Sequence, residues 1–236
     1  VSMMAPPRHA CTRRAISRPF THRHVEQFRA KINDIVIDVF SNADFRKIDV
    51  VVDIAVKIPM HVVCELLGIP TEDWPKLQSW TDDFLRIFLP DASAPETVKR
   101  TQKASQNFID YFGDMIDQRL KTPRNDLTSE FAASINTDGG IGKAGLIGAL
   151  RGLLTAGFET TAATISAGVY AFAQQPEQFD MLRDQPDLLP GAVEELLRWE
   201  TPVQVISRYL GKDTQVHDTV LSAGEQIWLL TGAANH

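Results

Sequence analysis

The sequence predicts a mainly α-helical protein with small β elements near its C-terminal end. Three observations lead to this fold class. The segment from Leu146 to Ala173 is apolar and contains no proline, and apolar residues recur at helical spacing through most of the chain before it. After Pro202 the period changes to short runs bounded by turn residues, which is typical of strands.

Composition is that of an ordinary globular protein. Of the 236 residues, 44% are hydrophobic and 23% charged, which suits one domain over residues 1–236 or a piece of a larger one. No run of about 18 apolar residues lacks a polar interruption, so we expect no membrane span. Two cysteines, Cys11 and Cys64, are too few for a disulfide framework and favour a reducing, cytoplasmic setting.

The apolar segment is expected to form one central helix, roughly 40 Å long and buried nearly all round. Beside the acid Glu159, one face of this helix carries only small residues: Gly152, Ala156, Gly157, Thr160, Ala163, Thr164 and Ala167. Small residues, a hydroxyl and a buried acid indicate room for a flat ligand with proton handling next to it. The alternative is close helix packing, with each Thr hydroxyl bonded to the carbonyl four residues earlier.

The six residues Ala156 to Thr161, AGFETT, resemble the oxygen-activating helix of cytochromes P-450, the haem-thiolate monooxygenases. The pattern of that family is Ala/Gly-Gly-x-Asp/Glu-Thr-Thr. The resemblance implies that Ala156 and Gly157 leave space for dioxygen beside a haem. It also implies that Thr160 hydrogen-bonds the bound oxygen and that Glu159 relays protons.

The positive charge of the chain is concentrated at its start. The whole chain carries −6 and residues 1–25 contribute +5 through five arginines without an acid, so the remainder carries −11. Within this region Pro6-Pro7 can open a helix from Arg8 to Ser17, on which His9 and Arg13 share a face. A solvated basic face is the plain alternative to an anion site.

The spacing H-x-x-x-R after a Pro-Pro pair resembles the C helix of bacterial P-450s. That resemblance implies that His9 and Arg13 hold a haem propionate, while Arg14, Arg18 and Arg23 lie toward the surface. A basic patch on an acidic protein can steer an acidic partner, which in this family is usually a ferredoxin.

Two other uses of these side chains are not favoured. Nucleic-acid binding is weakened by the −11 balance elsewhere and by the absence of a recognisable motif. The spacings His9-x-Cys11 and His22-x-His24 match no standard zinc module, so the sequence predicts no metal ligand in this chain.

Between the basic region and the central helix, capping and turn residues bound five further helices. The segment VVVDIAV is rich in Val and Ile, which is also typical of a strand, but the closing Gly68-Ile69-Pro70 favours a helix. LLGIPTEDW resembles the joint between the E and F helices of bacterial P-450s. In that family the helices flanking a loop such as Pro90–Pro95 form a substrate lid. The alternative is that these helices only pack against the rest of the helical bundle. The expected helices are Thr21–Ala43, Asp49–Leu67, one started by Thr71 and Asp73, Glu96–Lys121 and Asp126–Ser134.

A second strong motif lies in VEELLRWETP, where Glu195 and Arg198 are three residues apart on a predicted helix from Leu188 to Trp199. An exposed pair of this kind is common and worth little, but the apolar neighbours indicate partial burial. The segment resembles the K helix of P-450s, whose E-x-x-R pair is structural. Glu195 and Arg198 are therefore expected to act as a structural ion pair.

The last part of the chain is predicted to be β-rich. Val203–Arg208 and Ile227–Leu230 are strand-like, and Ser222–Glu225 forms a hairpin-like turn. Arg208 follows Arg198 by ten residues, about where the family places another propionate-binding arginine. Gly232–His236 resembles the family segment G-A-A-N-R-D, with His in place of Arg.

These motifs occur in the order of the family and cover essentially the whole chain. The family's iron ligand is a cysteine in the loop F-x-x-G-x-x-x-C-x-G, which does not occur here, and neither Cys11 nor Cys64 replaces it. The resemblance implies a cytochrome P-450 fold with helices C to K, truncated at both ends. We therefore expect the haem iron ligand to lie outside this chain and the fragment to be inactive alone.

For the complete protein the resemblance implies a haem-dependent monooxygenase. It would hydroxylate a small organic substrate with dioxygen and electrons from a ferredoxin-type donor, without a nucleic-acid or membrane partner. The alternative is a non-catalytic helical protein that binds a ligand or nucleic acid.

Overall fold

The computed structural model describes all residues except 1–7, 18–19, 22–24, 90, 134 and 136–140. The chain forms two compact units, residues 1–159 and residues 160–236, which meet within one long helix. Each unit is described by itself below, and a single domain over residues 1–236 stays a prediction. Pro6, Pro7, Arg18, Arg23, His22 and His24, which the sequence analysis singled out, lie outside the described residues.

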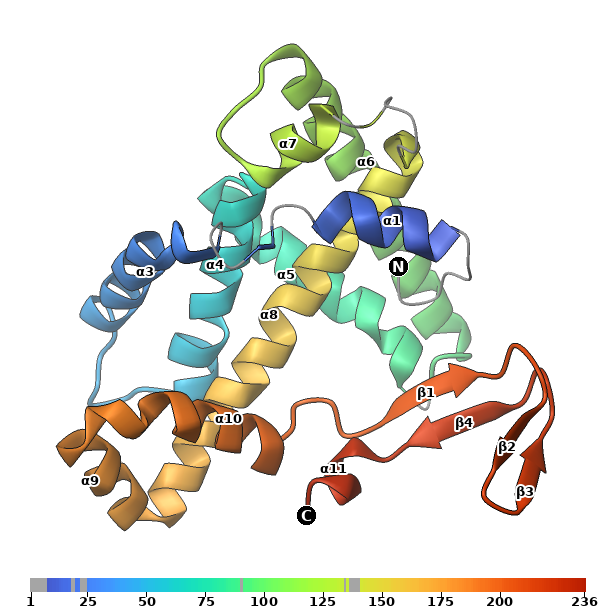
Figure 1. Cartoon of the computed structure of the whole chain (residues 1–236). Helices are drawn as coiled ribbons and strands as arrows, with labels where there is room; N and C mark the ends of the chain where they lie inside the picture. The colour runs from blue at the N-terminus through green and yellow to red at the C-terminus, as the bar shows by residue number, and fades with distance from the viewer. Residues whose placement is uncertain (1–7, 18–19, 22–24, 90, 134, 136–140) are drawn as a thin grey trace. The chain divides into compact units, whose positions relative to one another are not determined.

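The first unit is helical, as the sequence predicts (Figure 1). Its last element is the first half of α8, which runs from Gly142 to Gln174 in all. The preceding elements are α1 (Arg8–Ser17), α3 (Arg29–Ser41), the π-helix η1 (Val50–Ala55), α4 (Lys57–Leu67), the short 3₁₀ turn η2 (Thr71–Asp73), α5 (Trp74–Leu85), η3 (Arg86–Phe88), α6 (Pro95–Lys121) and α7 (Leu127–Ala133).

The core of this unit lies where α4, α5 and α6 meet α8. Phe108, Phe112 and Ile116 on α6 are completely buried. Trp80 and Phe84 of α5 each meet Phe108 edge to face, with ring centroids 5.6 and 6.4 Å apart. Such edge-to-face pairs add to the apolar burial that holds α5 against α6.

A buried ion pair connects the C-terminal ends of α4 and α6 with the start of α7. Arg119 Nε donates to Asp126 Oδ2 over 2.7 Å, and Arg119 Nη2 donates to the Gly68 carbonyl over 2.8 Å. Asp126 Oδ1 accepts from the Ser129 N–H over 2.7 Å, which confirms Asp126 as the cap of α7. Gly68 ends α4 with a φ of 71°, a left-handed conformation that favours glycine.

Three details of this unit differ from the sequence prediction. The helix expected from Thr21 is interrupted: Val25 and Glu26 are helical, Gln27 and Phe28 form a turn in which the Phe28 N–H donates to the Val25 carbonyl, and α3 begins at Arg29. The VVVDIAV segment is helical, but it opens as a π-helix capped by Asp49. No side-chain cap starts α5, since the Asp73 carboxylate accepts from Tyr111 instead, over 2.7 Å.

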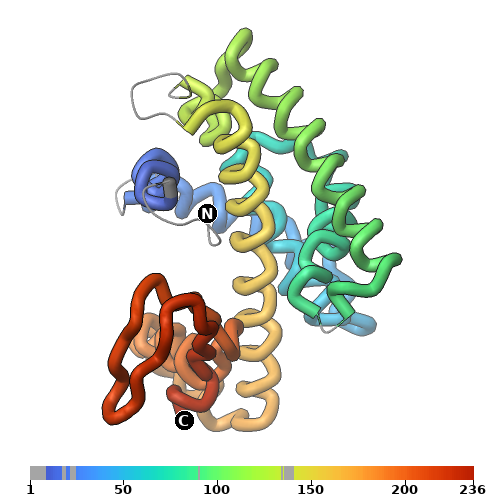
Figure 2. The backbone as a smooth tube through the Cα atoms, turned by 90° about the vertical axis from the view of Figure 1, so that its right-hand side faces the viewer, coloured from blue at the N-terminus to red at the C-terminus, as the bar shows by residue number. Residues whose placement is uncertain are grey.

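The central helix α8 is continuous, as Figure 2 shows, but the expectation that it is buried nearly all round is wrong. The largest buried side chains of α8 form one stripe, Leu146, Leu150, Leu154 and Phe158, each four residues after the last. Ala156, Gly157 and Glu159 on other sides of the helix are exposed. Of the predicted small-residue positions, Ala156, Gly157 and Ala163 are exposed, whereas Gly152, Thr160, Thr164 and Ala167 are partly buried.

The second unit contains the rest of α8 and the C-terminal elements. These are α9 (Pro176–Asp184), the 3₁₀ turn η4 (Pro186–Leu188), α10 (Leu189–Trp199), β1 (Ile206–Tyr209), β2 (Thr214–Val216), β3 (Thr219–Leu221), β4 (Gln226–Leu229) and α11 (Thr231–Ala234). Two antiparallel pairs form, β1 with β4 and β2 with β3. Arg208 on β1 lies opposite Ile227, and Thr214 lies opposite Leu221.

The second unit has almost no core of its own. Among residues 160–236, all of which are described, only Ala162, Gly168 and Gly232 are buried, so no large side chain is. The Ser222–Glu225 turn, with Gly224 at φ 89°, joins β3 to β4 without pairing them. In the described part of the chain, no helix combines the length and apolarity that a membrane span needs.

Candidate functional site

Thr160 lies at an apolar groove in the second unit. The groove has a volume of about 540 Å³ and is formed by α8, α10 and the residues that follow α10. Thr164 donates its hydroxyl hydrogen to the Thr160 carbonyl over 3.0 Å, the back-bonding that a packing helix would also show. The groove is lined by Thr160, Thr161, Thr164, Ile165, Gly168, Val169, Phe172, Val193, Leu196, Leu197 and Pro202.

Close helix packing explains why position 157 is a glycine. A Cβ at this position would lie 3.0 Å from Cγ2 of Val63, a buried residue of α4. The close approach of α4 accounts for this glycine, which is the alternative that the sequence left open. Ala156 and Thr160 are the neighbouring positions of the same motif, and their proposed contacts with a cofactor stay predictions.

Glu159 precedes Thr160 on α8 and has a perturbed carboxyl group. Partial burial raises the pKa of Glu159, and the carboxylate of Asp82 on α5 raises it further. Glu159 as a whole is exposed, so its raised pKa reflects a carboxyl group that has protein on one side and water on the other. An acid of this kind keeps its proton to a higher pH than an ordinary glutamate, as a proton relay requires.

The three predicted propionate ligands come from two elements. His9 and Arg13 stand on α1, where His9 is half-buried and Arg13 is exposed. Arg208 is exposed on β1 and donates from Nη1 to the Ser207 carbonyl over 2.8 Å. Among the described residues neither Arg13 nor Arg208 forms an ion pair with an acid, so both guanidinium groups can bind an anion. Because α1 and β1 belong to different units, a joint site stays a prediction.

Glu195 and Arg198 form a two-pronged ion pair on α10, with Nε to Oε2 2.8 Å and Nη2 to Oε1 2.6 Å. The expected partial burial is wrong, since the side chains are 60% and 42% exposed. Arg198 also donates to the carbonyl of Asn235, and the Trp199 ring meets the His236 ring 4.4 Å away. The pair therefore links α10 to the segment that follows β4.

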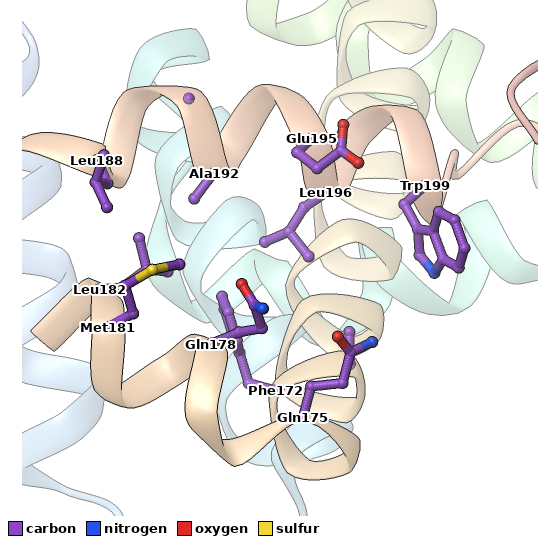
Figure 3. Close-up of a pocket in the computed structure, with 12 residues that line it drawn as sticks. Phe172, Gln175, Gln178, Met181, Leu182, Leu188, Ala192, Glu195, Leu196 and Trp199 are labelled. Carbon is purple, nitrogen blue, oxygen red and sulfur yellow. The ribbon is translucent and has the colours of Figure 1, made fainter.

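A second groove in the same unit lies between the end of α8, α9 and α10 (Figure 3). Its volume is about 530 Å³, and Phe172, Leu182 and Leu196 give it an apolar lining. Gln175, Gln178 and Glu195 supply its polar atoms. No residue of the predicted catalytic or haem-binding set lies in this groove.

Neither cysteine has the surroundings of a metal-binding thiolate. Cys64 is completely buried, and burial raises the pKa of its thiol to about 12. Cys11 is exposed on α1. In the part of the chain that the structure describes, no three His, Cys, Asp or Glu side chains gather as a metal site would need.

Two residues near the site were missed by the sequence analysis. Asp82 perturbs Glu159 from a different helix, and no sequence signal pairs them. Arg151 is half-buried on α8, with its guanidinium carbon 4.3 Å from the ring centroid of Phe84 on α5. A signal for Arg151 existed, because it and Glu159 are the only charged residues between Leu146 and Ala173.

Known proteins similar to this chain are bacterial cytochromes P450. Cytochrome P450 CYP107DY1 of Priestia megaterium is 36% identical over 231 residues, and mycinamicin IV hydroxylase/epoxidase of Micromonospora griseorubida is 34% identical over 237 residues. Each alignment covers 98% of this chain but only 55% and 58% of the relative. The chain therefore spans a little more than half the length of the curated relatives it matches.

Solved structures agree with the fold. P450BioI, solved in complex with an acyl carrier protein, matches with a TM-score of 0.91 and 28% identity, covering 98% of this chain and 60% of that one. Mycobacterium smegmatis CYP164A2 gives the same TM-score and identity over 59% of its chain. The sequence model of the family described as Cytochrome P450 matches residues 1–236 throughout. With this match over its whole length, the chain belongs to the cytochrome P450 family.

Proposed function

We propose that the protein to which these residues belong is a haem-dependent monooxygenase that inserts an oxygen atom into a small organic substrate. The observation that carries the proposal is the pair Glu159 and Thr160 on α8, an acid with a raised pKa followed by a hydroxyl at an apolar groove. Membership of the family supports it, and does not favour the alternative of a non-catalytic helical protein.

The residues present fit a haem. The groove beside Thr160 is apolar, which suits a porphyrin ring, and Arg13 and Arg208 are available for its carboxylates, with His9 beside Arg13. When bound, the haem would supply oxygen activation and electron transfer. Since Cys11 is exposed on α1 and Cys64 carries a buried, protonated thiol, we propose that neither ligates the iron.

Residues of this chain would transfer protons and leave room for a ligand beside α8. Glu159 would take up a proton more readily than an ordinary glutamate, because burial raises its pKa, and could pass it toward the neighbouring Thr160, whose hydroxyl can both donate and accept. Ala156 keeps this side of α8 free of bulky side chains. Apolar residues of the groove, such as Ile165 and Leu197, exclude water from the site.

Electrons would come from a small redox partner, and we propose a ferredoxin-type donor in the cytoplasm. Arg14, which is exposed on α1, supports this choice, because a basic surface residue can attract an acidic protein.

The proposal is tested by titrating the 236-residue chain with haemin and following the Soret band. We expect saturable binding, weakened about tenfold in Arg208→Gln and in Arg13→Gln, because each removes a charge-assisted hydrogen bond to a carboxylate. Arg46→Gln, which removes an exposed arginine elsewhere, is the matched control and should bind as the parent does. Absence of saturable binding, or equal binding by all three variants, would contradict the proposed site.

A second measurement concerns the iron ligand. The reduced, carbon monoxide-treated complex should lack the Soret position of a thiolate-ligated haem. A thiolate-type band that disappears in Cys11→Ser or Cys64→Ser would show that the chain supplies the ligand itself.

A further inference from the structure

Tyr111 is a half-buried tyrosine whose hydroxyl is hydrogen-bonded to a carboxylate. It lies on α6, and its hydroxyl donates to Oδ2 of Asp73, the last residue of η2, over 2.7 Å. Burial raises the pKa of Tyr111 and the Asp73 carboxylate raises it further, so the phenol keeps its proton at physiological pH. The other two tyrosines, Tyr170 and Tyr209, are 64% and 72% exposed, and neither hydroxyl meets an acid among the described residues.

Lys76 holds this carboxylate in place and lies over the tyrosine ring. Its ammonium nitrogen is 2.7 Å from Asp73 Oδ1, which leaves Oδ2 for the Tyr111 hydroxyl. The same nitrogen lies 4.9 Å from the centroid of the Tyr111 ring. A positive charge at this distance disfavours a second positive charge on the ring. Loss of an electron from Tyr111 therefore requires that the phenolic proton leaves as well, and Asp73 Oδ2 is the acceptor already in contact with it.

Trp80 is the oxidisable neighbour of Tyr111. The two rings meet edge to face, with centroids 6.1 Å apart, and they come from α5 and α6. Aromatic rings in contact exchange electrons readily, and an indole is easily oxidised. The other rings beside this pair belong to Phe108, 5.6 Å from Trp80, and Phe112, 5.5 Å from Tyr111. Because phenylalanine resists oxidation, an electron lost from Trp80 is replaced within this cluster by one from Tyr111.

We propose that Tyr111 is a redox-active tyrosine, oxidised through Trp80 to a neutral radical with Asp73 as its proton acceptor. A one-electron oxidant removes an electron from Trp80, and the indole N–H proton goes to water. The tryptophanyl radical then takes one electron from Tyr111 and one proton from water. As that electron leaves, the O–H bond of Tyr111 breaks and its proton binds Asp73 Oδ2.

This site goes beyond the proposed function and does not depend on it. Its residues all lie in the first unit, and any strong one-electron oxidant can start the step. In the proposed monooxygenase, oxidants formed when no substrate reacts would meet in Tyr111 a side chain that can be restored. A reductant that supplies one electron restores the phenol, because Asp73 still holds the proton.

The experiment oxidises the 236-residue chain with azidyl radicals in pulse radiolysis and follows the tryptophanyl and tyrosyl absorption bands. The background Tyr170→Phe/Tyr209→Phe leaves Tyr111 as the sole tyrosine, because the chain contains three. In this background we expect the tryptophanyl band to convert into the tyrosyl band at a rate independent of protein concentration. Asp73→Asn keeps a hydrogen-bond acceptor but cannot hold the proton, so it should slow the conversion at least about 100-fold.

Two tryptophan variants test the route of the electron. Trp80→Phe should lose the fast conversion, whereas Trp228→Phe, which replaces a tryptophan that is 61% exposed in the second unit, is the matched control and should keep it. Tyr111→Phe removes only the hydroxyl and should leave the circular dichroism spectrum unchanged and no tyrosyl signal. Absence of a tyrosyl radical in the background chain, or an unchanged rate in Asp73→Asn or Trp80→Phe, would overturn the proposal. The haemin titration has a separate readout, so either proposal can fail without the other.

Discussion

Replacing Arg119 by methionine tests how much the buried ion pair between α6 and α7 contributes to stability. The side chains of Arg119 and Asp126 are only 2% and 4% exposed, and their charged atoms are 2.7 Å apart. The methionine would leave the Asp126 carboxylate with the Ser129 N–H as its remaining partner and would free the Gly68 carbonyl. Breaking one side of a buried pair typically costs about 3–5 kcal/mol, because the other charge stays buried without compensation.

The assay is urea unfolding followed by far-ultraviolet circular dichroism. For a chain of this size a loss of about 3–5 kcal/mol corresponds to a fall in melting temperature on the order of 10 °C. Arg100→Met removes the exposed partner of Asp83 and should cost less than about 1 kcal/mol. The double variant Arg119→Met/Asp126→Leu should recover much of the loss, since it removes both charges together. A loss for Arg119→Met no larger than that for Arg100→Met would refute the reasoning.

Two further predictions concern Cys64 and Gly157. Iodoacetamide at pH 8 should modify Cys11 but not Cys64, because Cys64 is buried with a thiol pKa of about 12. Mass spectrometry should find one adduct on the folded chain and two adducts in urea. Rapid labelling of both cysteines in the folded chain would contradict this prediction. Gly157→Ala should destabilise the chain by about 1 kcal/mol, since the clash with the stiff Val63 side chain outweighs the gain in helix propensity. In a Val63→Ala background the same change should become stabilising, and destabilisation that persists there would show that Gly157 is needed for something other than the approach of α4.

The sequence predicts most elements of this fold because their signals are local. Gly68 ends α4 in the left-handed conformation that its position after Leu67 suggests, and Asp126 caps α7 as its place before a helical run suggests. The expected cap at Asp73 fails for a non-local reason. Its carboxylate is bound by the Tyr111 hydroxyl, 38 residues later in the chain, and by Lys76.

The candidate site was predictable in its motifs but not in its surroundings. Glu159 and Thr160 are recognisable from six consecutive residues, but Asp82, which raises the pKa of Glu159, comes from α5. Arg119 shows the same limit, since a basic residue in the last turn of an amphipathic helix normally faces solvent. Its burial depends on the Gly68 carbonyl and on Asp126, which lie in other elements.

The exposure of Glu195 and Arg198 changes what the structural role of this pair can be. An exposed ion pair contributes at most about 1 kcal/mol, so the pair cannot hold the second unit together by charge attraction alone. The pair orients the guanidinium of Arg198. Its Nε and Nη2 donate to the two carboxylate oxygens of Glu195, and its Nη1 donates to the Asn235 carbonyl. Gly232 strengthens the same connection, since its N–H donates to the Gln204 carbonyl over 3.1 Å. In a unit where no large side chain is buried, these directed hydrogen bonds determine where the segment after β4 meets α10.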